Sequence, residues 1–182
     1  EISELCDNLF CPVTFGGGIR TLADCQRILR GGADKIAIGT AGHIRPQFIR
    51  EVSEKFGAQA MTAAIDVKQN TVWTRCVTND TGKDPIEWAT ELESLGAGEL
   101  LLTDIERDGT MQGYNLDLIR LVSSSVSIPV IAAGGCGEYS DMVDAIEAGA
   151  HAVASGAMFQ FCDATPKGAA RFMKEAGIAT RL

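Results

Sequence analysis

Short runs of apolar and β-branched residues alternate along the chain with longer segments in which apolar residues recur at helical spacing. This alternation is typical of parallel strand–helix–strand units. It predicts six strands, at residues 12–15, 35–38, 61–65, 100–103, 129–132 and 152–155. The pattern therefore predicts an α/β fold built on a parallel sheet.

Three of the intervening helices carry signals for their first residue. Thr21 precedes one amphipathic stretch, Asn115 precedes another, and Asp84 is followed by Pro85 and then by Glu87. Ser, Thr, Asp and Asn side chains accept hydrogen bonds from the first free N–H groups of a helix, and proline fits its first position. We expect helices to begin directly after Thr21, Asp84 and Asn115.

The chain contains an internal repeat, because residues 12–41 can be laid on residues 129–158 without a gap. Both copies have the order strand, double glycine, helix, glycine-alanine, strand, glycine. The repeat predicts two equivalent half-sites. Its coinciding positions include Gly17-Gly18 with Gly134-Gly135, Asp24 with Asp141, and Gly39 with Gly156.

The double glycines follow strands, and the next strand in each copy ends in a small-residue turn, Gly39-Thr40 or Gly156-Ala157. Missing side chains let backbone N–H groups approach an anion, and a helix N-terminus adds favourable dipole charge. Tight turns alone would also explain one such copy, but the duplication favours two phosphate cradles. The phosphate-binding positions expected from the residues alone include Gly18, Gly134 and Gly135.

Carboxylates follow two of the predicted strands, where barrel proteins place their chemistry. Asp66 ends one apolar run and could exchange a proton with a substrate or simply cap the next turn. In the segment after Thr103, Asp108 and Gly109 could orient a substrate hydroxyl or phosphate, whereas we interpret Glu106-Arg107 as a solvated ion pair. At the opposite strand ends, Lys35 and Glu99 could line a channel or be ordinary surface charges.

Composition narrows the classes of function. The chain has 182 residues, 46% of them hydrophobic, and a net charge of -8 without a local Lys/Arg cluster. This balance disfavours nucleic acid and anionic membranes as partners. We expect one globular domain over residues 1–182, in the cytoplasm, since neither a signal peptide nor a membrane-spanning run is evident.

The 6 cysteines are scattered, and only 2 histidines accompany them. Zinc sites use closely spaced Cys and His ligands, so we expect free thiols of a reducing compartment and neither a metal nor a cofactor.

Several segments resemble the HisF family, the cyclase subunits of imidazole glycerol phosphate synthase, in order and spacing. They are residues 14–20, 32–35, 64–68, 96–99, 101–103, 107–110, 113–114 and 128–135. The resemblance implies a (β/α) barrel of the TIM type. It implies that ammonia from a glutaminase partner cleaves and cyclises a bisphosphorylated formimino-aminoimidazole carboxamide ribonucleotide, giving imidazole glycerol phosphate for histidine biosynthesis.

The same resemblance assigns roles to single positions. Asp66 matches one of two catalytic aspartates, Lys35 and Glu99 match charges at the ammonia entrance, and Gln59 matches a position that faces the glutaminase. The matches to phosphate or substrate positions are Gly18, Gly39, Thr40, Asp108, Gly109, Gly135, Gly156 and Ala157.

This chain also departs from the family pattern. Gly39 stands where asparagine is usual, and Ala133 and Ala157 lie where serines are usual. The family's first two strands, with the other catalytic aspartate, have no counterpart before Glu1, so we expect an incomplete barrel of six units out of eight. The activity of the chain alone is therefore open, and its unpaired strand edges predict a homo-oligomer.

Other interpretations stay open within and beyond this resemblance. The isomerase HisA shares the duplicated phosphate sites, although residues 64–68 and 113–114 favour the cyclase. A paralogue that supplies ammonia-dependent chemistry to surface-polysaccharide sugars has similar motifs at residues 66–68 and 111–114. The chain could also be a non-catalytic phosphate-binding or assembly module.

Overall fold

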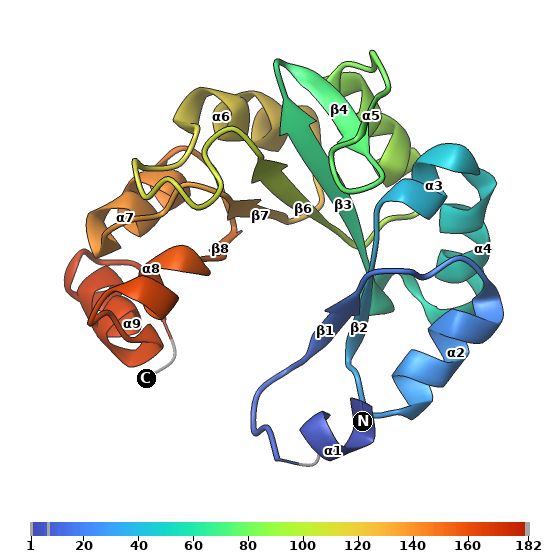
Figure 1. The fold of residues 1–182 in the computed structure, drawn as a ribbon, viewed down its shortest axis with the longest axis horizontal. Coiled ribbons are helices and arrows are strands. Elements are labelled where there is room, and N and C mark those ends of the chain that lie inside the picture. Colours follow the sequence, from blue (N-terminus) through green and yellow to red (C-terminus); the bar gives the residue numbers. More distant parts are fainter. Residues whose placement is uncertain (1, 7, 181–182) are drawn as a thin grey trace.

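The computed structural model describes residues 2–6 and 8–180, and these form a curled sheet covered by helices (Figure 1). Six strands pair in parallel in the order β1-β2-β3-β6-β7-β8. Their bounds are β1 Thr14–Gly16, β2 Lys35–Ile38, β3 Met61–Lys68, β6 Glu99–Asp104, β7 Val130–Ala133 and β8 Ala152–Val153.

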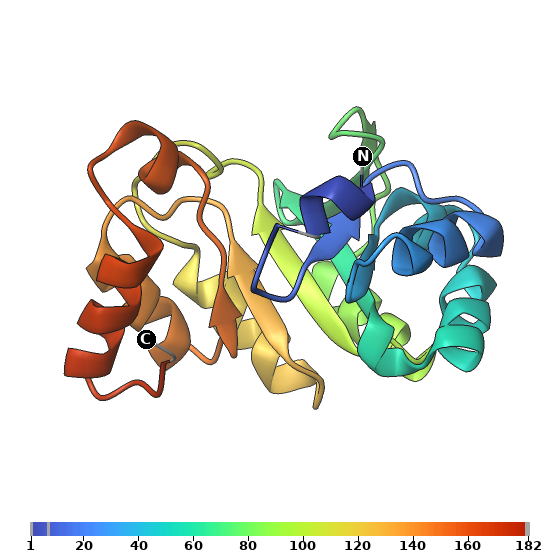
Figure 2. The same ribbon diagram turned by 90° about the horizontal axis from the view of Figure 1, so that it is seen from below.

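The helices lie on the convex side of the sheet, with α7 and α9 at one end and α2 and α4 at the other (Figures 1 and 2). The longer helices are α2 Leu22–Arg30, α4 Gln47–Phe56, α5 Pro85–Ser94, α6 Leu116–Ser125, α7 Tyr139–Glu147 and α9 Pro166–Glu175. The short ones are α1 Ile2–Cys6, α3 Thr40–Ile44, η1 Ala58–Ala60 and α8 Ala157–Phe161. Within the described ranges, no helix is long and apolar enough to cross a membrane.

The three expected helix starts are confirmed. The Thr21 side chain accepts a hydrogen bond from the N–H of Asp24, and Asn115 accepts one from the N–H of Leu118. Asp84 accepts from two backbone N–H groups of α5, which begins with Pro85. These side chains satisfy N–H groups that have no partner inside the helix.

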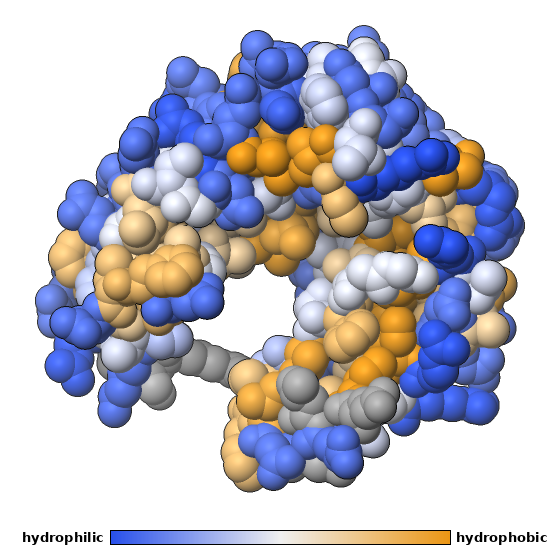
Figure 3. Space-filling model, viewed as in Figure 1, coloured by the Kyte–Doolittle hydropathy of each residue, from blue (hydrophilic) through white to orange (hydrophobic). Residues whose placement is uncertain are grey.

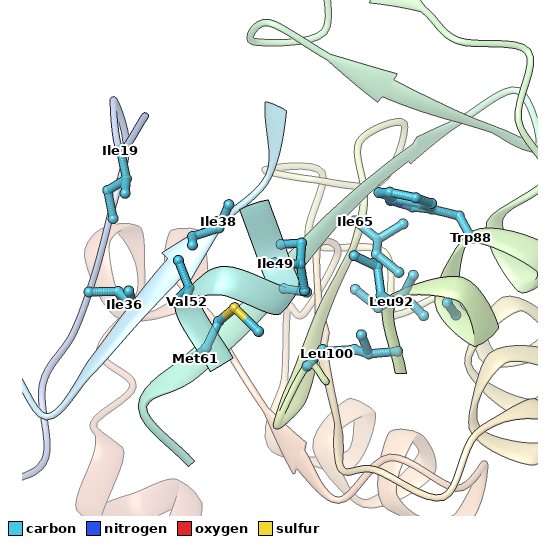
Figure 4. Packing of buried hydrophobic residues seen from close by; sticks show 14 of the residues in the cluster. Ile19, Ile36, Ile38, Ile49, Val52, Met61, Ile65, Trp88, Leu92 and Leu100 are labelled. Carbon is cyan, nitrogen blue, oxygen red and sulfur yellow. The ribbon is translucent and has the colours of Figure 1, made fainter. Parts of the chain in front are cut away.

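The hydrophobic core lies between the sheet and the helices, because alternate strand residues point to opposite faces. On β3 the buried residues Ala63 and Ile65 face the helices, and Figure 4 shows Ile65 among side chains from α5 such as Trp88 and Leu92. Ala64 and Asp66 face the concave side and are only half-buried. The concave face is therefore the surface left for binding.

The sheet does not close. The described part of the chain leaves β1 and β8 as the ends of the strand order, and Figure 3 shows open space in the middle of the molecule, with hydrophobic residues along part of its wall. The expected incomplete TIM-type barrel of six parallel strands is confirmed. Phe10, just before β1, is fully exposed at 104%. Self-association through this open side stays a prediction.

The sequence pattern missed a hairpin. β3 runs to Lys68 instead of ending at residue 65, and then turns back into β4 Thr71–Thr74 and β5 Asn79–Asp80. Asp66 consequently lies within a strand, not after one. The turn from β3 into β4 is made by Gln69 and Asn70, with φ of 51° and 61°, and the turn from β4 into β5 contains Arg75, Cys76 and Val77, with φ of 55°, 54° and 62°. Asparagine tolerates positive φ, so Asn70 was a weak turn signal, but neither turn contains a glycine.

Candidate anion-binding and proton-transfer site

The first glycine loop is open. Gly17 and Gly18 follow β1 with φ of 98° and 69°, and a Cβ atom built on either would meet nothing within 4 Å. Gly39 and Thr40 follow the paired strand β2. The pairing of β1 with β2 thus brings the expected positions Gly18, Gly39 and Thr40 to one edge of the sheet. We call these three residues the first loop pair.

The second glycine loop is tightly packed. A Cβ atom on Gly134 would lie 2.4 Å from the carbonyl oxygen of Asp104, and one on Gly135 would lie 2.2 Å from that of Gly113. The Gly113 N–H donates to the Gly135 carbonyl oxygen over 2.8 Å. These glycines are therefore required for packing against the loop after β6, whatever they bind. The two half-sites are equivalent in sequence but differ in their surroundings.

Gly156 and Ala157 follow β8, next to the end of β7. At Gly156 φ is -108°, and an added Cβ would meet nothing within 4 Å. We call Gly134, Gly135, Gly156 and Ala157 the second loop pair. A cavity of about 310 Å³ opens beside it, lined by Gly137, Glu138, Tyr139, Met158, Asp163 and Ala164. Two carboxylates in that lining repel an anion, so the anion is expected on the Gly156 side.

The internal repeat extends to the hydrogen bonds at the start of both helices. Asp24 Oδ2 accepts from the N–H groups of Arg20 and Thr21, over 3.2 and 3.0 Å. Its repeat partner Asp141 accepts from the N–H groups at 137 and 138, over 2.8 and 3.0 Å. Hydrogen bonds from the Thr21 side chain and the Arg20 backbone lower the pKa of Asp24. Both carboxylates occupy the N–H groups of the two residues directly before the helix, so we expect an anion at the preceding glycines.

Gly135→Ala is expected to reduce the free energy of unfolding by about 3 kcal/mol, because the added methyl group meets a carbonyl oxygen and the residue has a φ of 107°. Gly156→Ala is the matched control. It adds the same atom in open space at negative φ and should change stability by less than about 0.5 kcal/mol. Urea unfolding of both variants measures the difference; equal midpoints and slopes would show that the packing at Gly135 is not tight.

Asp66 lies on the concave face of β3, in register with Thr103 on β6. Burial raises the pKa of Asp66, and the carboxylate of Asp108 raises it further. Asp66, Thr103 and Asp108 thus lie near one another at the carboxyl edge of the sheet. A half-buried carboxyl group with a raised pKa is a candidate to give and take protons.

The loop after β6 is held by Asp104, which is 8% exposed. Its Oδ1 accepts from the Glu106 N–H over 2.9 Å, and its Oδ2 from the Asn115 side chain over 2.7 Å. Glu106 instead accepts from the Gln69 N–H over 3.0 Å, while Arg107 donates to the Gly113 carbonyl oxygen over 3.1 Å. The interpretation of Glu106-Arg107 as a solvated ion pair was therefore wrong, because each side chain fixes a different backbone segment.

Gly109 has a φ of 76° and open space where a side chain would be. Asp108 beside it donates its backbone N–H to the Asp104 carbonyl oxygen over 3.0 Å. Asp108 in this loop lies close enough for its carboxylate to raise the pKa of Asp66.

At the opposite edge of the sheet, Lys35 and Glu99 form an ion pair across β3. Their side chains are 33% and 12% exposed, and the Thr62 hydroxyl donates to Glu99 Oε1 over 2.6 Å. Strand alternation placed both charges on the concave face, and the β2-β3-β6 order brought them together. Gln59 is exposed in η1, directly before β3, at the same edge.

Sequence reasoning missed one residue beside Asp66. Trp73 of β4 lies directly opposite Asp66 in the antiparallel pairing. The alternation of Thr71, Val72, Trp73 and Thr74 is a weak strand signal that could have indicated it.

A curled parallel sheet with glycine loops and a half-buried carboxyl group at its carboxyl edge defines an incomplete (β/α) barrel with a candidate anion site. The family model described as "Histidine biosynthesis protein" matches residues 1–165. The chain belongs to this family, which includes HisA-type and HisF-type proteins. The family indicates a phosphorylated ribonucleotide as the class of substrate.

Proposed function

We propose that this protein is a HisF-type cyclase that acts on a bisphosphorylated formimino-aminoimidazole carboxamide ribonucleotide with ammonia. The observation that carries the proposal is the position of Asp66, with a raised pKa, on the concave face between two strand pairs that end in glycine loops. Each loop pair would hold one phosphate through backbone N–H groups. The products would be imidazole glycerol phosphate and an aminoimidazole carboxamide ribonucleotide.

In this reaction Asp66 would transfer protons at the nitrogen atoms that form and break bonds. Ammonia adds to the substrate, the carbon–nitrogen bond to the leaving ribonucleotide breaks, and the imidazole ring closes with loss of water. Each change at nitrogen requires a proton to be taken up or released, and a carboxyl group with a raised pKa is better suited to do both than an ordinary aspartate. Thr103, in register with Asp66, would orient the substrate.

Ammonia would enter at the other edge of the sheet. The Lys35 and Glu99 side chains meet on the concave face there, so a rearrangement of their ion pair would open or close the route. The exposed Gln59 would face a glutaminase subunit on the same side. These roles rest on the resemblance to HisF and on the shared location of the three residues.

A second candidate is a phosphate-binding module without turnover. The strands β1 and β8, which in the described part of the chain pair on one side only, favour it, because barrel enzymes assemble their sites from loops around the whole sheet. The small residues Gly39, Ala133 and Ala157 also leave the loops with fewer side-chain contacts to phosphate than is usual in HisF. A paralogue that acts on sugar precursors of surface polysaccharides would share the fold and loops but take another ligand.

The test combines calorimetric titration with an activity assay. The bisphosphorylated ribonucleotide is added with and without ammonium salts, and formation of imidazole glycerol phosphate is followed. Binding and turnover support the cyclase, and binding without turnover supports the module. Failure to bind contradicts both.

A further inference from the structure

The hairpin after β3 places an indole ring beside Asp66. Trp73 of β4 is directly opposite Asp66 in the antiparallel pairing. Directly opposed residues of an antiparallel pair face the same side of the sheet. The Trp73 ring therefore lies on the side that carries Asp66 and Lys68, while its neighbours Val72 and Thr74 are buried on the other side.

The ring is held in a fixed orientation. The Trp73 Nε1–H donates to the Lys68 carbonyl oxygen over 2.9 Å and to the Thr71 hydroxyl over 3.0 Å. The side chain is half-buried, so part of it stays accessible to a ligand. A rigid, partly exposed indole is suited to stack on a planar ring, because little conformational freedom is lost when the ligand binds.

A flexible cation lies over one face of the indole. Lys68 Nζ lies 4.9 Å from the centre of the Trp73 ring. A cation–π contact at an accessible site is weaker than the stacking of a nucleobase on an aromatic side chain. A planar ligand can therefore displace the ammonium group, which can then contact a polar substituent of the ligand.

The hairpin also extends toward the first loop pair. On the edge of β3 that faces away from β6, β2 pairs with residues 61–63 and β4 with residues 66–68. β4 thus lies directly beyond the end of β2, where Gly39 and Thr40 follow. The Arg75 N–H donates to the Thr40 hydroxyl over 2.9 Å and anchors the hairpin there. A ligand that reaches from Thr40 to Asp66 has to pass Trp73.

We propose that Trp73 is the stacking surface for the heteroaromatic ring of a phosphorylated ribonucleotide. The proposal rests on the proposed function, which supplies the phosphate at the first loop pair. It adds a residue that determines specificity: Trp73 would select phosphates that carry a planar ring over simple sugar phosphates of the same charge.

Tryptophan fluorescence tests this, since the chain has 2 tryptophans and the other, Trp88, is 2% exposed. The probes are aminoimidazole carboxamide ribonucleotide and ribose 5-phosphate. The ribonucleotide should quench the Trp73 emission and bind about tenfold more tightly than ribose 5-phosphate. Trp73→Leu should abolish this difference, whereas Trp73→Phe, which lacks the indole hydrogen bonds but keeps a ring, should retain most of it in a competition assay.

The outcomes separate the two proposals. If the wild type binds both probes equally, or if Trp73→Leu keeps the tenfold preference, stacking is refuted while the phosphate site stands. If the wild type binds neither probe, both the proposed function and the stacking are refuted. Circular dichroism of Trp73→Phe and Trp73→Leu checks that the hairpin variants remain folded.

Discussion

Asp66→Asn is expected to lower turnover by about 100- to 10,000-fold while ligand affinity stays within about threefold. The amide has the shape of the carboxyl group but cannot exchange a proton at neutral pH. Burial and the nearby Asp108 raise the pKa of Asp66, so the residue is placed to act as both acid and base. Assays with ammonium salts measure the rate, and calorimetry measures binding.

The pH dependence has a defined sign. The ionised form of Asp66 accumulates only above its raised pKa, so the acid limb of kcat/KM should lie at higher pH than for an ordinary aspartate. A carboxyl group whose pKa is raised by folding binds protons more readily in the folded state, so stability falls as the pH rises from the unfolded to the folded pKa. Asp66→Asn should therefore be at least as stable as the wild type at pH 7.

The matched control is Asp117→Asn on α6, where the aspartate side chain is 91% exposed. That variant should keep wild-type turnover. An Asp66→Asn protein that is equally active would remove Asp66 from the mechanism, and one that has lost stability would show that the carboxylate is structural.

Gly156→Asp is expected to weaken binding of the bisphosphorylated ribonucleotide by about 100-fold, because the new carboxylate lies where the second phosphate would bind. This position is suited to the test: φ is -108°, and an added Cβ meets nothing within 4 Å. Gly135→Asp would be uninformative, because the side chain collides with the Gly113 carbonyl oxygen before its charge matters.

Gly156→Ala separates charge from volume and should bind within about threefold of the wild type. The loss caused by Gly156→Asp should shrink at high ionic strength, since salt screens the repulsion. Titrations of both variants at low and high salt measure the two effects. If aspartate and alanine at position 156 weaken binding equally, no phosphate binds there.

The sequence predicted those structural features that depend on neighbouring residues in the chain. Strand alternation and caps such as Thr21 and Asn115 depend on neighbouring residues, so strands and helix starts could be placed. The packing of Gly135 could not be predicted, because the carbonyl oxygen that it meets belongs to Gly113, in a different loop. The hairpin was missed because its turn, Gln69-Asn70, contains no glycine.

The contacts of charged side chains likewise depend on segments that are distant in the chain. The sequence left open whether Lys35 and Glu99 face inward or are ordinary surface charges, and parallel pairing with β3 explains why they meet. The partners of Glu106 and Arg107 depend on how the loop after β6 folds back, which the periodicity does not describe. Adjacent opposite charges were therefore a poor guide to an ion pair.

The close backbone contact between Gly113 and Gly135 also constrains how this protein can evolve. Position 135 cannot gain a side chain unless the segment at position 113 first moves away, and that segment belongs to the loop that carries Asp108. Position 135 should therefore stay glycine among relatives that keep this loop. A lineage that gains a side chain there should also change the geometry around Asp108, so a substitution at this turn would alter the chemistry available at Asp66.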